Sequence, residues 1–426
     1  MFIASTPPAG LCTVLHDHLG ADQATCGNVW GTLVHPSGLA TFWFTVVAIL
    51  WAGFFLLEGF DFGVGILLRY VGKNDDERTQ TVRTIGHVWD GNQVWLLTAG
   101  GATFAAFPHW YATMFSGFYL AFALLLVGLI LRGIGIEYRG KTHTERGRTW
   151  AEWAIIIGSF LPALLLGVAF ANIGWGVNIT GLHSVPALGG PTSGDMTNSL
   201  FSLLNPFGLL GGLVTLTLFI FHGAVFLTMR TDGEVAKRAR KVATGISPIV
   251  AVLAVAFVIW VFYLVHHTYK PVLQQSSMHM MMMYAAAIIL ILAFVVSAAV
   301  MFLGKSLRLA FAASGVTAAL IPIWLFIVLF PTVMPARNDI LFTWFISQAS
   351  SSHTTLVVMT WVACIFTPIV LIYIIWTYWA FRARVTGKSV LEGDGGYATP
   401  LRKLVTSATH SAREVFPPKS QETGKA

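Results

Sequence analysis

The residues with the clearest capacity for chemistry surround an aspartate at position 90. They lie in segment 86–95 (GHVWDGNQVW), which leads an apolar run that continues to Phe107. If that run crosses a bilayer, Asp90 is an ionisable group inside a membrane. Such groups are unfavourable there and commonly mark ion or proton pathways.

Asp90 belongs to a predicted stripe of side chains on one helix face. At spacings of four, three and four residues, the stripe comprises Arg83, His87, Asp90 and Val94. In a continuous helix, Asp90 would lie about 10 Å beyond Arg83 along the axis. A row of closely spaced titratable groups is what a proton relay requires. The alternative is that Asp90 only forms a hydrogen bond with a neighbouring helix.

Two further acids, Glu58 and Asp61, lie three residues apart near the end of the first apolar run and therefore share a helix face. Three glycines among and after them make this end thin, so a partner helix or a lipid-like ligand can approach closely. The competing interpretation is a pair of acids that reach for water. The apolar residues that continue for about two turns beyond them argue against it.

Glu137 and Lys141 end the third apolar run with the spacing of an i, i+4 pair. They could pass protons towards Asp90. A bare pair of this kind is more commonly a solvated helix end.

The histidines and methionines do not indicate a metal or heme site in this chain. His222 stands alone in an apolar run, where a hydrogen bond to a neighbour is commoner than ligation. No two runs offer an obvious pair of axial histidines. Segment 278–283 (MHMMMM) contains soft ligands suited to copper(I), but it also begins an apolar run in which methionine is ordinary filler. We therefore predict no metal.

The composition places these residues in a membrane protein. Of the 426 residues, 55% are hydrophobic and only 11% are charged, and the mean hydropathy is +0.71. A soluble domain has about a quarter of its residues charged. We predict an all-α polytopic membrane protein whose nine transmembrane helices cover residues 40–68, 82–107, 111–136, 151–175, 200–229, 243–267, 281–303, 309–331 and 354–381.

Lysines and arginines alternate in a way that predicts the orientation. All but Lys270 and Arg337 fall in the loops after spans one, three, five and seven or in the C-terminal tail, with Arg132 and Arg139 assigned to the loop after span three. By the positive-inside rule, these loops and the tail face the cytoplasm, and the N-terminus lies outside. The net charge of +7 then reflects topology and requires no nucleic-acid partner.

The two ends differ from the rest of the chain. Residues 1–38 form a predicted outside (periplasmic) extension, in which Cys12 and Cys26 either form a disulfide or remain free thiols. Residues 383–426 are polar and basic, and we predict a mostly disordered cytoplasmic tail near anionic lipid.

A series of short motifs resembles, in the same order, subunit II of cytochrome bd-type quinol oxidases. The most specific motif is WDGNQVW at 89–95, and the resemblance covers about residues 42–382. The other matching segments are GFDFGVG at 59–65, AGGA at 99–102, FSGFY at 115–119, NPFGLL at 205–210, two Pro-containing pairs within 330–335 and MTW at 359–361.

The resemblance implies a membrane complex that oxidises ubiquinol or a similar quinol and reduces dioxygen to water. It implies that a heme-bearing subunit I carries heme b and heme d, while this chain holds no heme. The implied fold is two four-helix bundles, over residues 39–180 and 197–331, plus a peripheral ninth helix at 353–382. Implied partners are subunit I, a small single-helix subunit, quinone and lipid in a bacterial inner (cytoplasmic) membrane.

The resemblance also implies roles for individual residues. The family's cytoplasmic proton path matches Asp90, Glu137 and Lys141, with Glu137 standing where an aspartate is common. Positions near the subunit interface or a bound quinone match Asp61 and Trp89, and Glu58 lies beside them. His87 is not part of the family motif. Segment 348–352 (QASSS) lacks an outer aspartate that many members carry.

A hypothesis from another functional class is a proton-coupled secondary transporter with Asp61 and Asp90 as coupling sites. Buried acids in a many-helix protein suit that function. The sequence shows no internal repeat with paired broken helices, and nine spans do not divide into equal halves.

Overall fold

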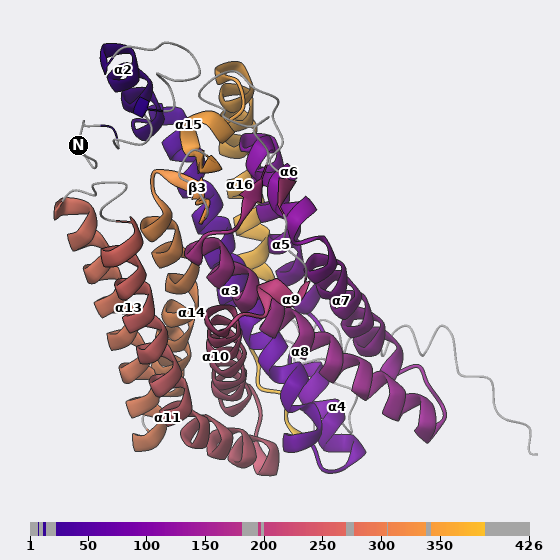
Figure 1. The fold of residues 1–426 in the computed structure, drawn as a ribbon. Coiled ribbons are helices and arrows are strands. Elements are labelled where there is room, and N and C mark those ends of the chain that lie inside the picture. The colour runs from indigo at the N-terminus through magenta and orange to yellow at the C-terminus, as the bar shows by residue number, and fades with distance from the viewer. Residues whose placement is uncertain are drawn as a thin grey trace, which may run out of the picture.

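The structure, a computed structural model, describes residues 7, 12–13, 23–180, 195–196, 200–269, 277–304, 306–337 and 342–387. Within these ranges the fold is almost entirely helical, with the long helices running side by side (Figure 1). The long helices are α3 (Gly38–Val71), α5 (Trp89–Ala106), α7 (Tyr119–Arg139), α8 (Glu145–Trp175), α10 (Pro206–Arg230), α11 (Gly233–Leu264), α13 (Ser277–Leu303), α14 (Leu307–Leu329) and α16 (His353–Ala380).

Shorter elements connect and cover these helices. They are the helices α2 (Gln23–Val34), α4 (Asp75–Arg83), α6 (Pro108–Gly117), α9 (Leu200–Leu203), α15 (Ile346–Ala349) and a π-helical turn at Val265–Tyr269. Strand β1 (Ile179–Thr180) pairs antiparallel with β2 (Asp195–Met196). Strand β3 (Thr332–Met334) pairs antiparallel with β4 (Trp344–Phe345).

Eight helical segments of the described chain are long and apolar enough to cross a bilayer. They contain α3, α7, α8, α10, α11, α13, α14 and α16. The ninth predicted span, 82–107, corresponds to α5, which has only 18 residues and carries Asp90, Asn92 and Gln93 in its first turn. The predicted span 111–136 is also interrupted, because a break at Phe118 separates α6 from α7.

Helix α3 lies at the centre of the helix assembly and packs against α5, α8, α10 and α14. Glycines permit these close approaches. A Cβ added at Gly63 would overlap the carbonyl oxygen of Phe219 and lie 2.9 Å from the Cα of Gly223 on α10. A Cβ added at Gly65 would collide with Ser159 on α8. The prediction that a partner helix approaches this end of α3 is confirmed.

Helix α16 lies at the periphery and buries almost none of its surface in this chain. The Nε1 atom of Trp43 on α3 donates hydrogen bonds to Leu356 O at 3.2 Å and to Thr360 Oγ1 at 3.0 Å. Apolar side chains such as Trp361, Ile365 and Ile372 are exposed. In a bilayer such a face contacts lipid or another subunit.

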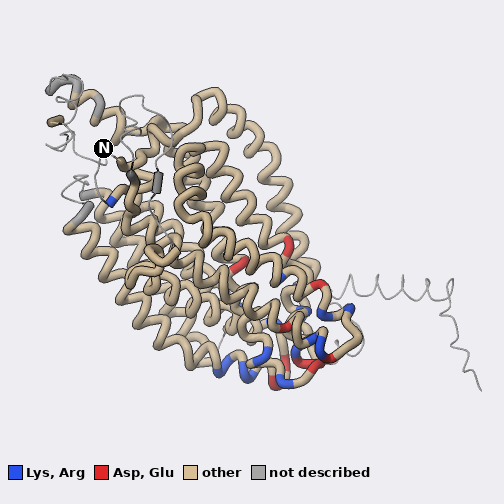
Figure 2. The backbone as a smooth tube through the Cα atoms, turned by 45° about the vertical axis from the view of Figure 1, so that its right-hand side comes forward, with Lys and Arg blue, Asp and Glu red and all other residues tan. Residues whose placement is uncertain are grey.

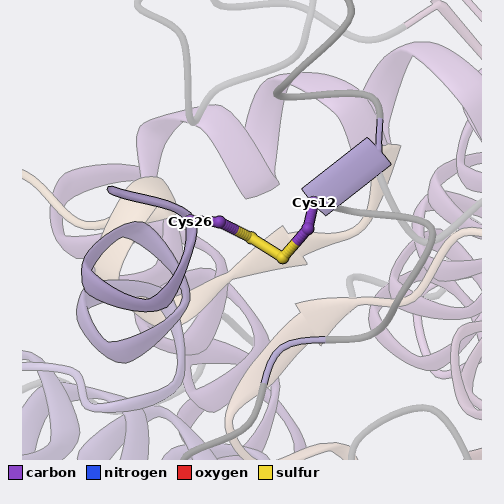
Figure 3. Close-up of a disulfide and its surroundings, with 2 residues drawn as sticks. All are labelled: Cys12 and Cys26. Carbon is purple, nitrogen blue, oxygen red and sulfur yellow. A yellow bond between two sulfur atoms is a disulfide. The ribbon is translucent and has the colours of Figure 1, made fainter. Parts of the chain in front are cut away.

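The N-terminal segment contains a disulfide and packs against the helix assembly. Cys12 and Cys26 are joined by a disulfide (Figure 3), which decides between the two alternatives left by the sequence. The Trp30 ring on α2 is buried and lies 5.9 Å from the Phe345 ring. Ser347 Oγ also donates to Leu33 O at 3.0 Å. The predicted tail beyond residue 387 lies outside the described residues.

Charged side chains gather at one end of the helix assembly (Figure 2). Arg337 lies at the other end of α8 from Glu145, where its guanidinium sits 4.6 Å from the centre of the Trp175 ring. This polarity matches the alternation of charges in the sequence.

Candidate functional site: a buried acid–arginine cluster beside Asp90

A fully buried ion pair joins α3 to α7. Arg132 Nη1 donates a hydrogen bond to Glu58 Oε2 at 2.8 Å, and its Nη2 also donates to Oε1. Both side chains are 0% exposed. The guanidinium lies 4.7 Å from the centre of the Phe62 ring. The assignment of Arg132 to a cytoplasmic loop is therefore wrong, because its side chain turns into the helix assembly to pair with Glu58.

Asp61 extends this pair into a cluster that also reaches α5 and α16. Its Oδ2 accepts a hydrogen bond from Asn92 Nδ2 at 2.8 Å. Tyr378 of α16 donates its hydroxyl to Asn92 Oδ1 at 2.7 Å. We refer to Glu58, Asp61, Asn92, Arg132 and Tyr378 as the acid–arginine cluster.

The cluster contains two buried carboxyl groups and one guanidinium. Both carboxyl groups are 0% exposed, and among the residues that the structure describes Asp61 Oδ1 has no hydrogen-bond partner. Burying a charge without a partner is unfavourable. A site with one more acid than cations is therefore suited to hold a proton. The interpretation of Glu58 and Asp61 as acids that reach for water is wrong.

Asp90 lies next to this cluster but does not belong to it. Its side chain is exposed at the start of α5, where it lines a cavity of about 590 Å³ with Gln93, Trp110 and Leu129. Gln93 connects the two regions, because its Oε1 accepts a hydrogen bond from Arg132 Nη2 at 3.3 Å. A mostly apolar cavity of this size is in the range of small-molecule sites.

Trp89 is half-buried and packs at the junction between α5 and α7. A Cβ added at Gly133 of α7 would lie 3.3 Å from its ring. This contact places the first turn of α5 about one turn before Glu137 along α7. Trp89 therefore lies between the acid–arginine cluster and the solvated end of α7.

Glu137 and Lys141 form an exposed ion pair at that end. Their Oε2 and Nζ atoms are 3.4 Å apart, and the side chains are 51% and 66% exposed. In the part of the chain that the structure describes, no hydrogen bond or ion pair joins Asp90 to either residue. Asp90 at the start of α5 and the Glu137–Lys141 pair at the end of α7 therefore lie on the same side of the helix assembly. The structure does not link them directly.

The predicted stripe from Arg83 to Val94 is wrong. Helix α4 ends at Arg83, residues 84–88 form turns, and α5 begins at Trp89. Bonds between residues three apart tighten this turn, including Thr84 N to Thr81 O at 3.2 Å. The His87 ring stacks on Phe381 with centroids 4.2 Å apart. His87 and Asp90 therefore do not share a continuous helix face.

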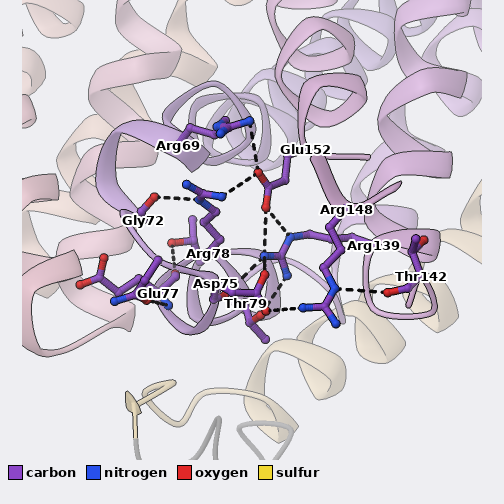
Figure 4. A network of polar contacts seen from close by, with 12 residues as sticks. Arg69, Gly72, Asp75, Glu77, Arg78, Thr79, Arg139, Thr142, Arg148 and Glu152 are labelled. Carbon is purple, nitrogen blue, oxygen red and sulfur yellow. Dashed lines mark hydrogen bonds and ion pairs between the residues drawn. The ribbon is translucent and has the colours of Figure 1, made fainter. Parts of the chain in front are cut away.

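A second polar network, centred on Glu152, was not predicted from the sequence (Figure 4). Glu152 is buried at the start of α8, and its carboxylate accepts hydrogen bonds from Arg78 at 3.2 Å and from Arg139 at 3.1 Å. Arg69 approaches to 3.6 Å. The assignment of Arg139 to a solvated loop is also wrong. The available signal was that Glu152 is the one acid in the predicted span 151–175.

His222 is hydrogen-bonded through both ring nitrogens. Nδ1 lies 2.7 Å from Ser314 Oγ, and Nε2 lies 3.1 Å from Leu56 O. This confirms the prediction that His222 bonds to its neighbours. In the ranges described by the structure, no group of three or more His, Cys, Asp or Glu side chains has an arrangement that could hold a metal ion.

Comparisons with known proteins extend over most of the chain. A family model described as cytochrome bd terminal oxidase subunit II matches residues 39–381. Cytochrome bd-I ubiquinol oxidase subunit 2 of Escherichia coli K12 is 38% identical over 371 residues, which cover 82% of this chain and 95% of that protein. Cytochrome bd ubiquinol oxidase subunit 2 of Bacillus subtilis is 38% identical over 356 residues, which cover 83% of this chain and 98% of that protein.

A solved structure has a similar fold. A chain in the structure of bd oxidase from Geobacillus thermodenitrificans aligns with a TM-score of 0.58 and 17% sequence identity, covering 80% of this chain and 96% of that chain. These relatives are named as oxidase subunits, which leaves the transporter hypothesis without support.

Proposed function

Because the chain belongs to the family of cytochrome bd terminal oxidase subunit II, we propose that it is the heme-free subunit of a quinol-oxidising, oxygen-reducing respiratory complex. The observation that carries this proposal is the continuous family match over residues 39–381. Its partner is subunit I, which supplies heme b and heme d and oxidises ubiquinol or another quinol. A small single-helix subunit and lipid complete the assembly.

The proposed membrane topology has nine transmembrane helices, with α5 as the span that composition alone does not identify. Helices α3, α5, α7 and α8 form the first bundle (39–180), and α10, α11, α13 and α14 form the second (197–331). Within the proposed bundles α7 packs on α8, α10 on α11 and α13 on α14, while α3 and α8 also pack on α10 and join the two bundles. Helix α16 is the peripheral ninth helix (353–382).

The proposed orientation puts the charged end of the molecule in the cytoplasm of a bacterium and the disulfide-linked N-terminal segment in the periplasm. The distribution of lysines and arginines supports it. A disulfide between Cys12 and Cys26 also suits an oxidising compartment.

Subunit I is proposed to cover the outer face of α5. Asp90 shares this face with exposed apolar residues, notably Val94 (48% exposed), Leu97 (77%) and Phe104 (58%). The spacing of four, three and seven residues places them on one side of the helix. A carboxylate that faces lipid is unfavourable, whereas one in a subunit interface can be hydrated or paired.

The proposed role of Asp90, Glu137 and Lys141 is to bring cytoplasmic protons to the interface with subunit I. The solvated Glu137–Lys141 pair collects protons, and Asp90 receives them through water along the junction marked by Trp89. Glu58 and Asp61 lie behind this junction, close to the interface and to the cavity beside Asp90. That cavity is a candidate location for a quinone, since its walls are largely apolar.

The experiment that tests the proposal replaces Asp90 with Asn in the complete complex. We expect Asp90→Asn to lower quinol-dependent oxygen consumption by about tenfold or more, because proton delivery would be impaired. The matched control is Asp76→Asn, since Asp76 is an exposed acid at the same end but outside the path. Unchanged oxygen consumption together with an unchanged heme absorption spectrum in the Asp90 variant would refute the proton role.

A further inference from the structure

A cleft lined by arginines opens at the charged end of the molecule, apart from the acid–arginine cluster. Its volume is about 850 Å³. Five arginines contribute to its walls: Arg83, Arg230, Arg308, Arg382 and Arg384. No aspartate or glutamate is among the described residues that line it. We refer to this feature as the basic cleft.

The basic cleft forms where four segments meet, and hydrogen bonds hold its walls in place. The chain that follows α16 runs back beneath α10, with Val385 N donating to Arg230 O at 2.9 Å. Gln80 of α4 donates to Val385 O at 2.8 Å, and Arg384 Nε donates to Met229 O at 3.0 Å. The cleft is therefore held in shape by contacts among its own walls.

Three of these arginines, Arg230, Arg382 and Arg384, donate hydrogen bonds to backbone carbonyl groups. Arg230 donates to the Phe381 carbonyl, and Arg382 donates to the Trp379 carbonyl at 2.8 Å. A carbonyl oxygen orients a guanidinium but carries no net charge. The nearby acid Asp232 accepts hydrogen bonds from Gln80 and Gly387 and does not line the cleft.

The start of α14 adds to the positive potential. Ser306, Leu307 and Arg308 line the cleft, and Ser306 is the N-cap of this 23-residue helix. The N-terminus of a helix carries a partial positive charge and unsatisfied N–H groups that favour phosphate. Arginine side chains also recognise phosphate oxygens through two parallel hydrogen bonds. The cleft thus has the chemistry of a phosphate site.

Apolar side chains also line the cleft, including Phe226, Phe311 and Phe381. Next to the cleft, α16 exposes Tyr373 (63%), Trp376 (53%) and Trp379 (46%) along its outer side. Aromatic side chains of this kind are enriched at the interface between lipid headgroups and hydrocarbon. A ligand with a phosphate head and hydrocarbon chains matches this combination better than a soluble anion does.

We propose that the basic cleft binds the phosphate of an anionic phospholipid whose acyl chains lie along the outer face of α16. Such a lipid would link the end of α16 to α10 and α14 through one headgroup. Basic pockets between transmembrane helices are known to hold anionic headgroups.

The test counts lipids bound to the purified complete complex by native mass spectrometry. The probes are phosphatidylglycerol, phosphatidylcholine and inorganic phosphate. The cleft variant is Arg308→Gln/Arg382→Gln. The control variant is Arg146→Gln/Lys241→Gln, which removes the same charge from exposed positions outside the cleft.

We expect the complex to retain phosphatidylglycerol in preference to phosphatidylcholine, and the cleft variant to weaken this binding by about thirtyfold. The estimate follows because each basic side chain near an anionic lipid contributes about a fivefold factor. The control variant should bind as the unmodified complex does, and inorganic phosphate should not displace the lipid.

Three results would overturn the proposal. Equal weakening in both variants would indicate nonspecific charge attraction. Displacement by inorganic phosphate would identify a soluble anion as the ligand. Absence of a preference for phosphatidylglycerol in the unmodified complex would exclude a headgroup site, and this measurement does not depend on whether the variants fold.

Discussion

Arg132 is the residue on which the buried acids depend. It provides the cation for Glu58 and donates to Gln93, while Asp61 lies within the same cluster. Breaking a buried ion pair by removing one partner costs about 3–5 kcal/mol, because the other charge stays buried without compensation. Removing Arg132 should therefore lower the stability of the folded protein, and this effect can be measured without measuring proton transfer.

We predict that Arg132→Met destabilises the complex strongly, by about 3–5 kcal/mol. The measurement is the thermal unfolding midpoint of the purified complex, followed by tryptophan fluorescence. Arg146→Met is the control, because Arg146 is exposed. Adding Glu58→Gln to Arg132→Met should restore part of the loss, since it removes the uncompensated carboxylate. A complex that tolerates Arg132→Met as well as Arg146→Met would contradict this account of the cluster.

At the charged end of the molecule, Glu77 provides a prediction for pH dependence. A hydrogen bond from Arg238, at 2.8 Å, lowers the pKa of Glu77 below its ordinary value of 4.5. An acid whose pKa is lowered by folding stabilises the protein above its unfolded pKa. This stabilisation is lost as the pH falls through the folded pKa.

The unfolding midpoint of Glu77→Gln should therefore fall below that of the unmodified protein at neutral pH, and the difference should be constant down to about pH 5. It should shrink at lower pH, where Glu77 becomes protonated. Asp76→Asn, at an exposed neighbouring position, is the control. A difference that grows on acidification would have the wrong sign for this mechanism.

The sequence was sufficient to identify the acids but not their partners. Glu58, Asp61 and Asp90 stand out because acids are rare in apolar runs. Arg132 is separated from Glu58 by 74 residues, so their pairing depends on α8, which packs against both α3 and α7. Arg132 also falls near the end of an apolar run, where a long basic side chain commonly reaches water instead. Only the packed helices show that it turns inward.

Among the helices, the segment between α4 and α5 differs most from the helix predicted from the sequence. A spacing of four, three and four residues predicts one helix face across positions 83–94. That inference requires an unbroken helix, and the tight turn at 84–88 breaks it. Hydrophobic periodicity does not reveal such a break, because the residues on either side still have helical spacing. The close approach of a partner helix to α3 was easier to predict, since closely spaced glycines indicate it, whereas only the structure shows that the partner is α10.

The glycine contact between α3 and α10 gives a prediction at this scale. A methyl group at position 63 would overlap the Phe219 carbonyl, which is backbone and cannot move aside cheaply. Gly63→Ala should therefore destabilise the complex by about 1–3 kcal/mol, the usual range for overpacking. Gly245→Ala is the control, since Gly245 lies in α11 with nothing within 4 Å of an added Cβ.

The unfolding midpoint of each purified variant provides the measurement. Gly245→Ala should be neutral or slightly stabilising, because alanine favours the helix by about 1 kcal/mol over glycine. Equal midpoints for the two variants would show that α3 and α10 do not depend on this close approach.

For the whole molecule, composition established an all-helical membrane protein, but the number of spans depends on α5. Residues 89–93 are too polar for that helix to be identified by hydropathy, yet a short polar first turn is compatible with a helix covered by another subunit. The family match supports an oxidase subunit, whereas the positions of its proton path depend on surfaces that subunit I would complete.

Charge polarity makes the orientation testable in intact cells. Arg146 lies in the first turn of α8, beside the charged network of Figure 4, whereas Ser352 is the N-cap of α16 and follows Ser351, which donates to Ala106 O at the far end of α5. In a background with Cys364→Ser, we expect a membrane-impermeant maleimide to label Ser352→Cys in spheroplasts and to label Arg146→Cys only after lysis. The reason is that lysines and arginines are retained on the cytoplasmic side during insertion. Labelling of Arg146→Cys before lysis would reverse the orientation and would place Glu137 and Lys141 on the wrong side to collect cytoplasmic protons.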